Sequence, residues 1–215
     1  RGVTVSILQR RAPGSIFSSS IDYTFSVAEG NRTEPREDFF FSEKSGKSTE
    51  TFLVPLSFDR THTLNVNLAL SQPDNYSVST IIRLRSGSPY TASIPASLAL
   101  QQTQFVQNSS NKPMQWSTDL KAEKYFTVGD LRFSILVQVD NLFDTENEID
   151  VFSNSGRALY NADQIANPAQ FTQTTSRIVR GDPGMIPLSA IDNYYQDPTN
   201  VSRPRLVRLG LSLFF

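Results

Sequence analysis

Long runs in which apolar and polar residues alternate are the feature that most constrains how this chain can fold. The even positions of 64–70 are all leucine or valine, and Asn65 and Asn67 lie between them. A second run of the same kind occupies 76–84, directly after the turn-forming residues of 73–75. Since the side chains of a strand point alternately to its two faces, this pattern predicts an antiparallel hairpin with one apolar and one polar face.

The same pattern recurs along the chain, whereas helical periodicity is poor nearly everywhere. We therefore predict an all-β fold built from about seven long antiparallel strands that form one segment over 1–215. The predicted strands lie near 2–11, 16–28, 58–71, 76–90, 114–126, 131–144 and 202–215.

The predicted connections fall into two classes of length. Three turns of about four residues alternate with three long connections, which cover approximately 29–57, 91–113 and 145–201. In outer-membrane β-barrels, short turns lie at one end of the strands and long loops at the other. A soluble β-sandwich more often has strands of about five or six residues with frequent turns, so the lengths favour a transmembrane barrel.

The predicted strands are long enough to cross a bilayer. At ~3.3 Å per residue, the run from 58 to 70 covers about 40 Å, which a tilt near 40° reduces to about 30 Å across the membrane. Aromatic residues on the apolar face fall at two levels, as at the two membrane interfaces, although strands of soluble proteins also favour aromatic residues. These residues are Phe17, Tyr76, Phe126 and Phe215 near the short turns, and Phe58, Tyr90, Trp116 and Phe143 near the long loops.

Composition excludes several classes of function. Twenty Lys and Arg residues against 21 Asp and Glu residues leave no basic field for nucleic acid. The chain has no cysteine and one histidine, His62, which is too little for a thiolate or multi-histidine metal site. No catalytic constellation is visible, so we predict neither an enzyme nor a bound cofactor or metal. Two acidic clusters leave calcium open as an alternative: Glu34, Glu37 and Asp38, and Asp144, Glu146, Glu148 and Asp150.

An odd number of strands has a consequence for closure. Single-chain bacterial barrels normally have an even number, and the smallest common ones have eight. An open sheet in lipid leaves unpaired backbone groups that cost several kcal/mol each. We therefore expect the chain to be the C-terminal part of a longer barrel, or to pair with another polypeptide that completes the wall.

Four short motifs resemble those of TonB-dependent outer-membrane receptors, in the order that this family shows. The segment 139–144, VDNLFD, resembles the V-x-N-L-F-D signature of the penultimate strand, and 58–64, FDRTHTL, resembles an F-D-x-R-H-T-L strand entry. The segment 85–91, RSGSPYT, resembles an x-S-G-x-P-Y-T strand exit, and 202–215 is similar to the closing strand with its aromatic terminus. The order Arg-Thr-His in 60–62 departs from the usual Arg-His of the second motif.

The resemblance implies a barrel of 22 strands in the outer membrane of a Gram-negative-type bacterium, which imports a scarce nutrient by energised transport. Its implied partners are the remainder of the barrel, a plug domain, the TonB complex, outer-membrane lipid and the outer-membrane assembly machinery. Neither a plug nor a TonB-engaging box is visible, and about fifteen strands are absent. Two other readings stay open: a different outer-membrane barrel, such as a porin or adhesin, or a soluble β-rich surface or glycan-binding domain.

Each face of the predicted sheet supplies candidate residues. Ile82, Leu68, Leu120, Val137 and Leu211 are expected to face hydrocarbon. An assembly signal at the carboxyl terminus is expected in Val207, Leu209, Leu211, Leu213 and Phe215. The residues expected to face the barrel lumen are Arg83, Arg85, Asp119, Lys121, Glu123, Arg132, Gln138 and Asp140.

Overall fold

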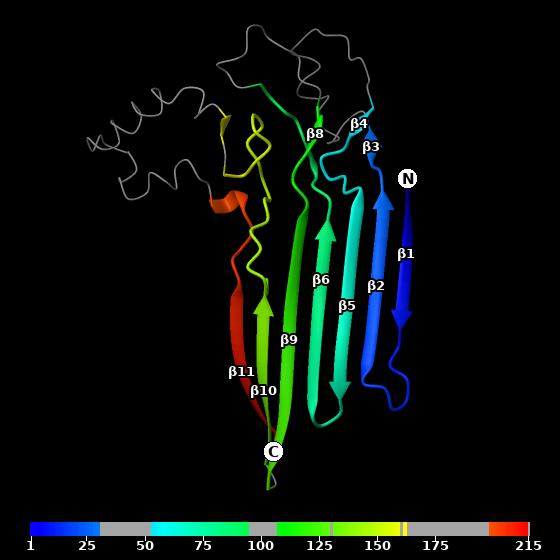
Figure 1. Cartoon of the computed structure of the whole chain (residues 1–215), viewed down its shortest axis with the longest axis vertical. Coiled ribbons are helices and arrows are strands. Elements are labelled where there is room, and N and C mark those ends of the chain that lie inside the picture. The colour runs from blue at the N-terminus through cyan, green and yellow to red at the C-terminus, as the bar shows by residue number, and fades with distance from the viewer. Residues whose placement is uncertain (31–52, 95–106, 130, 160, 163–197, 215) are drawn as a thin grey trace, which may run out of the picture.

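The computed structural model describes residues 1–30, 53–94, 107–129, 131–159, 161–162 and 198–214 of the chain. Within them, seven strands form one antiparallel sheet in the order β1-β2-β5-β6-β9-β10-β11, so each strand lies beside its neighbours in sequence among these seven (Figure 1). The predicted antiparallel all-β architecture is confirmed. The strands are β1 (Gly2–Gln9), β2 (Phe17–Ser26), β5 (His62–Gln72), β6 (Tyr76–Arg85), β9 (Gln115–Val128), β10 (Leu131–Asp140) and β11 (Leu206–Phe214).

Smaller elements lie beyond one end of this sheet. Two short two-stranded sheets pair β3 (Glu29–Gly30) with β4 (Val54–Pro55), and β7 (Pro89–Tyr90) with β8 (Ser110–Asn111). A 3-10 turn, η2 (Pro198–Asn200), precedes β11. No helix in the described part of the chain is long and apolar enough to cross a membrane.

The predicted beginning of the third long strand at residue 58 is wrong. The chain turns through Phe58–Thr61, and β5 begins at His62. Asp59 holds this turn, because its carboxylate accepts hydrogen bonds from the backbone N–H of Ala28 at 2.7 Å and from the Thr61 hydroxyl at 3.3 Å. Phe58 therefore lies in a turn, 64% exposed, and not on a strand.

The predicted strand 131–144 ends four residues early, at Asp140. Asn141 and Asp144 both adopt left-handed backbone conformations, with φ of 55° and 54°, which a strand cannot continue through. The Asn141 side chain stabilises the turn, since it accepts a hydrogen bond from the N–H of Thr145 at 2.9 Å and donates one to the Thr145 carbonyl at 3.0 Å. Asparagine is one of the few residues that tolerate this conformation.

Four other predicted strands are also too long. β1 ends at Gln9 and not at residue 11, and β2 covers Phe17–Ser26 and not 16–28. β6 stops at Arg85, and Pro89–Tyr90 belong to the separate strand β7. The last strand starts at Leu206, because the N–H of Arg205 is bonded to the carboxylate of Asp144 at 2.7 Å and takes no part in the ladder.

The connections are short at one end of the sheet and long at the other, as predicted. Residues 10–16, 73–75 and 129–130 make the short turns, which lie at the lower end in Figure 1. Residues 27–61, 86–114 and 141–205 make the long connections at the other end. We refer to these as the short-turn end and the long-loop end.

The strands are staggered in a constant sense. Ser6, in the middle of β1, leads along the ladder to Asp22, Asn65, Arg83 and Ser117. Asp22 is central in β2, but the last two residues of this row lie near the long-loop ends of β6 and β9. The stagger is about one residue per strand, and at ~3.3 Å per residue and ~4.8 Å between strands it corresponds to a tilt of about 35° when the strand ends are set level. Strands of closed barrels have tilts of this size.

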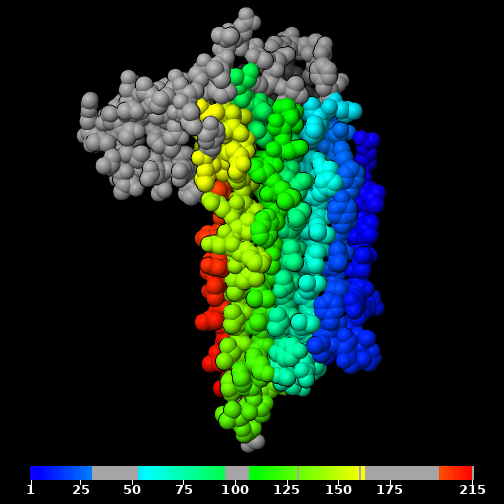
Figure 2. All heavy atoms as spheres, in the orientation of Figure 1, coloured from blue at the N-terminus to red at the C-terminus, as the bar shows by residue number. Residues whose placement is uncertain are grey.

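One face of the sheet is apolar across all seven strands. The ladder runs without interruption from Ile7 through Ile21 and Val66 to Ile82, and from Leu120 through Val139 to Val207. Figure 2 shows the strands side by side as one broad wall. The five residues expected to face hydrocarbon share this face, as the pairing of Leu68 and Leu120 with Thr80, and of Val137 with Leu209, requires.

Nothing in the described part of the chain buries this apolar face. Val54, Val139 and Ala158 are the buried apolar residues of the described chain, and the extensive contacts of each strand are with its neighbours in the sheet. Leu209 and Leu211 are 77% and 76% exposed. Within the described residues, the sheet therefore has no second layer of the kind that covers the apolar face of a soluble domain.

The bases of the long connections bind one another beyond the sheet. We call 53–61, 86–94, 107–114 and 141–159 the collar. The Asn108 side-chain amide donates to the Pro55 carbonyl at 2.6 Å, and the Gln115 amide at the start of β9 donates to the Glu148 carbonyl at 2.7 Å. Lys112 reaches Asp150 at 2.9 Å. These bonds link all three long connections at the level where they leave the strands.

Both outer strands of the sheet have an edge that no strand of the described residues pairs with. β1 and β11 each have one neighbour, and neither pairs with the other. Both run from the long-loop end to the short-turn end (Figure 1). Exposed edges of this length promote pairing with further strands.

Candidate functional site

The polar face of the sheet brings together the eight residues predicted to face a lumen. The ladder joins Arg83 to Ser117 and Lys121 to Gln138, and Gln138 in turn to Arg208. The strand period of two then puts the other members on the same face: Arg85 on β6, Asp119 and Glu123 on β9, and Arg132 and Asp140 on β10.

Charge on this face is concentrated in one part of it. On this face, strands β1, β2 and β5 carry mainly hydroxyl and amide groups, such as Thr4, Thr24 and Asn67, whereas β6 to β11 carry most of the charges. Thr4 and Thr24 share a hydrogen bond of 3.1 Å between their hydroxyls. The face therefore has a half in which Asp22 is the one charged residue of the strands, and a charged half.

Most charges of the charged half are paired across strands. Arg83 binds Asp119 at 2.5 Å, and Arg208 binds Asp140 at 2.7 Å. Asp119 also accepts the backbone N–H of Asn141 at 3.0 Å, which joins β9 to the turn after β10. These pairs are partly exposed, so each stabilises the fold by about 1 kcal/mol or less. They fix the positions of the side chains more than they contribute to stability.

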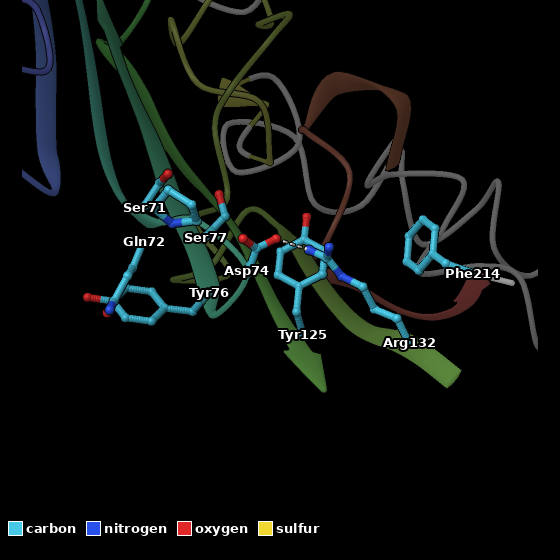
Figure 3. Close-up of a pocket in the computed structure, with 9 residues that line it drawn as sticks. Ser71, Gln72, Asp74, Tyr76, Ser77, Tyr125, Arg132 and Phe214 are labelled. Carbon is cyan, nitrogen blue, oxygen red and sulfur yellow. Dashed lines mark hydrogen bonds and ion pairs between the residues drawn. The ribbon is translucent and has the colours of Figure 1, made fainter. Parts of the chain in front are cut away.

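A cavity of about 550 Å³ lies at the short-turn end of the sheet. Figure 3 shows Arg132 from β10 reaching Asp74 of the β5–β6 turn, with Tyr125 and Phe214 nearby. The ion pair measures 2.5 Å, and the Arg132 guanidinium lies 5.2 Å from the centre of the Tyr125 ring. Asp74 can reach over because it has a left-handed backbone with φ of 58°. The arrangement joins two neighbouring hairpins and leaves no unpaired charge for a ligand.

Arg60 and Asn141 were not singled out from the sequence, and both prove central at the long-loop end. Arg60 interrupts the apolar parity that extends β5 backwards, and in the structure its guanidinium bonds to the Ser86 carbonyl and the Gln115 side chain at 2.7 and 3.2 Å. Asn141 additionally donates to the Arg203 carbonyl at 3.2 Å. Their signal in the sequence is their place in two of the four motifs.

The single histidine belongs to an aromatic cluster at the long-loop end of the apolar face. The Tyr23 hydroxyl lies 2.8 Å from His62 Nδ1, and the Phe25 ring centre lies 5.5 Å from that of the imidazole. Trp116 and Phe143 form a second aromatic contact at 5.7 Å. This level of the apolar face is therefore rich in rings, whereas Phe215 lies outside the described residues.

The acidic residues considered for calcium do not form a site in the described part of the chain. Glu148 accepts from Arg157 at 2.6 Å and Asp150 from Lys112 at 2.9 Å, while Asp144 accepts the N–H of Arg205. No group of three His, Asp or Glu side chains suited to a metal ion occurs among the described residues. Glu34, Glu37 and Asp38 lie outside them.

The hydrogen bond from Lys112 lowers the pKa of the Asp150 carboxyl below its usual value. A depressed pKa in the folded state means that the contact stabilises the collar above the ordinary pKa of an aspartate and is lost as the pH falls through the lowered value. Lys112→Met is expected to raise the Asp150 pKa, as measured by carboxyl NMR titration. Lys121→Met is the control and should leave it unchanged; equal titration of Asp150 in the protein with and without Lys112 would contradict the assignment.

Comparisons of this chain with protein-family models, curated proteins and solved structures found no match.

Proposed function

We propose that this chain forms part of the wall of a transmembrane β-barrel in the outer membrane, in a TonB-dependent receptor that imports a scarce nutrient. The observation that carries the proposal is the uncovered apolar face that extends over seven strands. Exposing so large an apolar surface to water costs ~25 cal/mol of free energy per Å², and contact with hydrocarbon removes that cost.

The stagger of the strands supports a barrel wall in particular. A tilt near 35° agrees with the strand tilt of outer-membrane barrels, which is about 35–45°. The separation of short turns from long connections agrees with the same architecture. Rings of Trp116, Tyr23 and Phe25 at the long-loop end of the apolar face suit a membrane interface, where aromatic side chains are enriched.

The free edges of β1 and β11 indicate which partners complete the wall. Lipid offers no hydrogen bonds to these backbone groups, so further strands must pair with both edges. Because β1 and β11 run in the same direction, antiparallel neighbours on both sides require an odd number of additional strands, which makes the total even. The remainder of the barrel is the first partner in this proposal, with a plug domain in the lumen.

The TonB-dependent class itself rests on the four motifs that resemble that family. Two of them converge in space, since Arg60 of one motif donates to the carbonyl of Ser86 in another. The TonB complex, outer-membrane lipid and the assembly machinery complete the proposed set of partners. Uptake that stops when the TonB complex is removed supports this class, whereas uptake that continues favours a passive porin.

The 215 residues contain no cysteine, so a cysteine introduced among them is the one labelling site in this part of the protein. A spin label attached to Val137→Cys in the full-length polypeptide should collide with oxygen dissolved in lipid, and one at Gln138→Cys with a water-soluble nickel complex. Leu209→Cys and Arg208→Cys repeat the comparison on the neighbouring strand. Equal access of the nickel complex to all four positions, or extraction of the protein without detergent, would rule out a membrane wall.

A further inference from the structure

Two arginines meet at the long-loop end of the polar face. In the ladder, Arg85 is paired with Thr63 on one side and Gln115 on the other. Arg60 Nη1 donates to Gln115 Oε1 at 3.2 Å and to the Ser86 carbonyl at 2.7 Å. The Gln115 amide is itself held by the Glu148 carbonyl, so the acceptor that positions Arg60 is fixed. Arg60 therefore stands beside the strand end that carries Arg85, near enough for the two charges to interact.

The carboxylates near this pair are bound elsewhere. Asp119 binds Arg83 and the Asn141 N–H, and Asp59 binds the Ala28 N–H and the Thr61 hydroxyl. Within the described part of the chain, neither Arg60 nor Arg85 takes part in an ion pair. Asp22, Lys121 and Glu123 also lack an ion pair on this face of the described sheet, but only at Arg60 and Arg85 do two unpaired cations lie near each other.

The two cations also repel each other. Burial lowers the pKa of the Arg60 guanidinium, and the nearby positive charge of Arg85 lowers it further. Two like charges near each other without a counter-charge repel, and a bound anion would reduce that repulsion.

We propose that Arg60 and Arg85 bind an oxyanion of a solute, a carboxylate or a phosphate, that enters from the long-loop end. This inference rests on the proposed function, for which it names the chemical class of the substrate. Guanidinium groups present planar sets of N–H donors that match carboxylate and phosphate oxygens. Hydroxyls continue the row away from Arg85, because Thr63 pairs with Thr24 and Thr24 with Thr4. Such a row suits a solute that carries further oxygen atoms beside its anionic group.

The opposite end of the same face provides a matched control. Arg132 also lies on the polar face, but it is paired with Asp74 and stacked near Tyr125. A solute attracted only by positive charge would be affected equally by Arg85 and Arg132. One bound at the proposed site depends on Arg85 alone.

Isothermal titration of the full-length protein, purified in detergent, with citrate and with inorganic pyrophosphate tests the site. At least one anion should bind, and Arg85→Gln should weaken its binding by about 10-fold, the effect of losing one hydrogen-bonded charge. Arg85→Lys should retain part of the affinity, and Arg132→Gln all of it. Preference for citrate assigns a polycarboxylate, and preference for pyrophosphate assigns a phosphate.

A second measurement uses the unaltered protein, so a change in folding caused by a substitution cannot affect its result. The affinity of the unaltered protein should fall as sodium chloride is added, because salt screens an exposed pair of charges. Absence of binding by both anions, affinity independent of salt, or equal loss in Arg132→Gln would each overturn the inference. None of these results bears on the spin-label measurement, so the membrane wall stands or fails separately.

Discussion

Val137→Arg is expected to destabilise the assembled protein by about 2–4 kcal/mol, whereas Gln138→Arg should cost much less. The two residues are adjacent on β10 but point to opposite faces of the sheet. The comparison therefore tests which face the arginine enters, at nearly the same position along the strand. Val137 pairs with Leu209 and Ala122 on the apolar face, so an arginine there must enter hydrocarbon. Gln138 pairs with Lys121 and Arg208 on the polar face, where added charge can remain hydrated.

Reversible unfolding from lipid vesicles in guanidinium chloride measures the difference. Leu209→Arg against Arg208→Lys repeats the comparison on β11, where both residues are exposed in the described structure. The proposed membrane wall predicts two large losses on the apolar face and two small changes on the polar face. Equal losses at Val137 and Gln138 would be incompatible with it.

Strand identity, pairing and facing could be predicted from the sequence because they depend on local alternation. A period of two over eight or more residues specifies both a strand and its two faces, and a short turn between two such runs pairs them. Within the observed strands the register preserves the predicted facing, for example Ile21 opposite Val66 and Val137 opposite Leu209. No tertiary contact was needed to decide these points.

The strand ends could not be predicted, because there alternation continues after pairing has stopped. Phe58 and Phe143 keep the apolar parity of their strands, yet both lie in turns. The ladder ends where a side chain, and not a neighbouring strand, bonds to the backbone. Asp59 accepts a hydrogen bond from the N–H of Ala28, and Asn141 accepts one from the N–H of Thr145. Such bonds join positions that lie far apart along the chain or depend on a rare φ value, and neither leaves a periodic signal.

The candidate site also has one part that could be predicted from the sequence and one part that could not. Its eight polar-face residues follow from parity alone, and the structure places them on one face. The pair of Arg60 and Arg85 does not follow from parity. Arg60 has the parity of the apolar face, and its guanidinium reaches Gln115 on the polar face because residues 58–61 form a turn. Charge pairing likewise depends on the register, which decides that Arg83 meets Asp119 and leaves Arg85 beside Gln115.

The collar joins the bases of the long connections, and two of its backbone segments approach each other very closely at Gly87. A Cβ atom built at this glycine would lie 1.6 Å from the carbonyl oxygen of Lys112 and 2.9 Å from that of Pro113. Both are backbone atoms, so no side-chain rotation can relieve the overlap. The contact brings the exit of β6 against the segment before β9, next to the hydrogen bond from the Lys112 N–H to the Ser88 carbonyl at 3.0 Å.

Gly87→Ala is therefore expected to cost about 3 kcal/mol or more, at or beyond the upper range for overpacking, because the backbone itself must move. Gly210→Ala is the matched control: its Cβ would meet only the Leu136 side chain, at 3.4 Å, and should change stability little. The damage should be local, since Gly87 lies outside the seven strands. Limited proteolysis should find 86–94 and 107–114 newly cleaved in Gly87→Ala, while the strands stay protected. A Gly87→Ala protein with an intact collar would show that the close approach to Lys112 does not hold the bases of the long connections together.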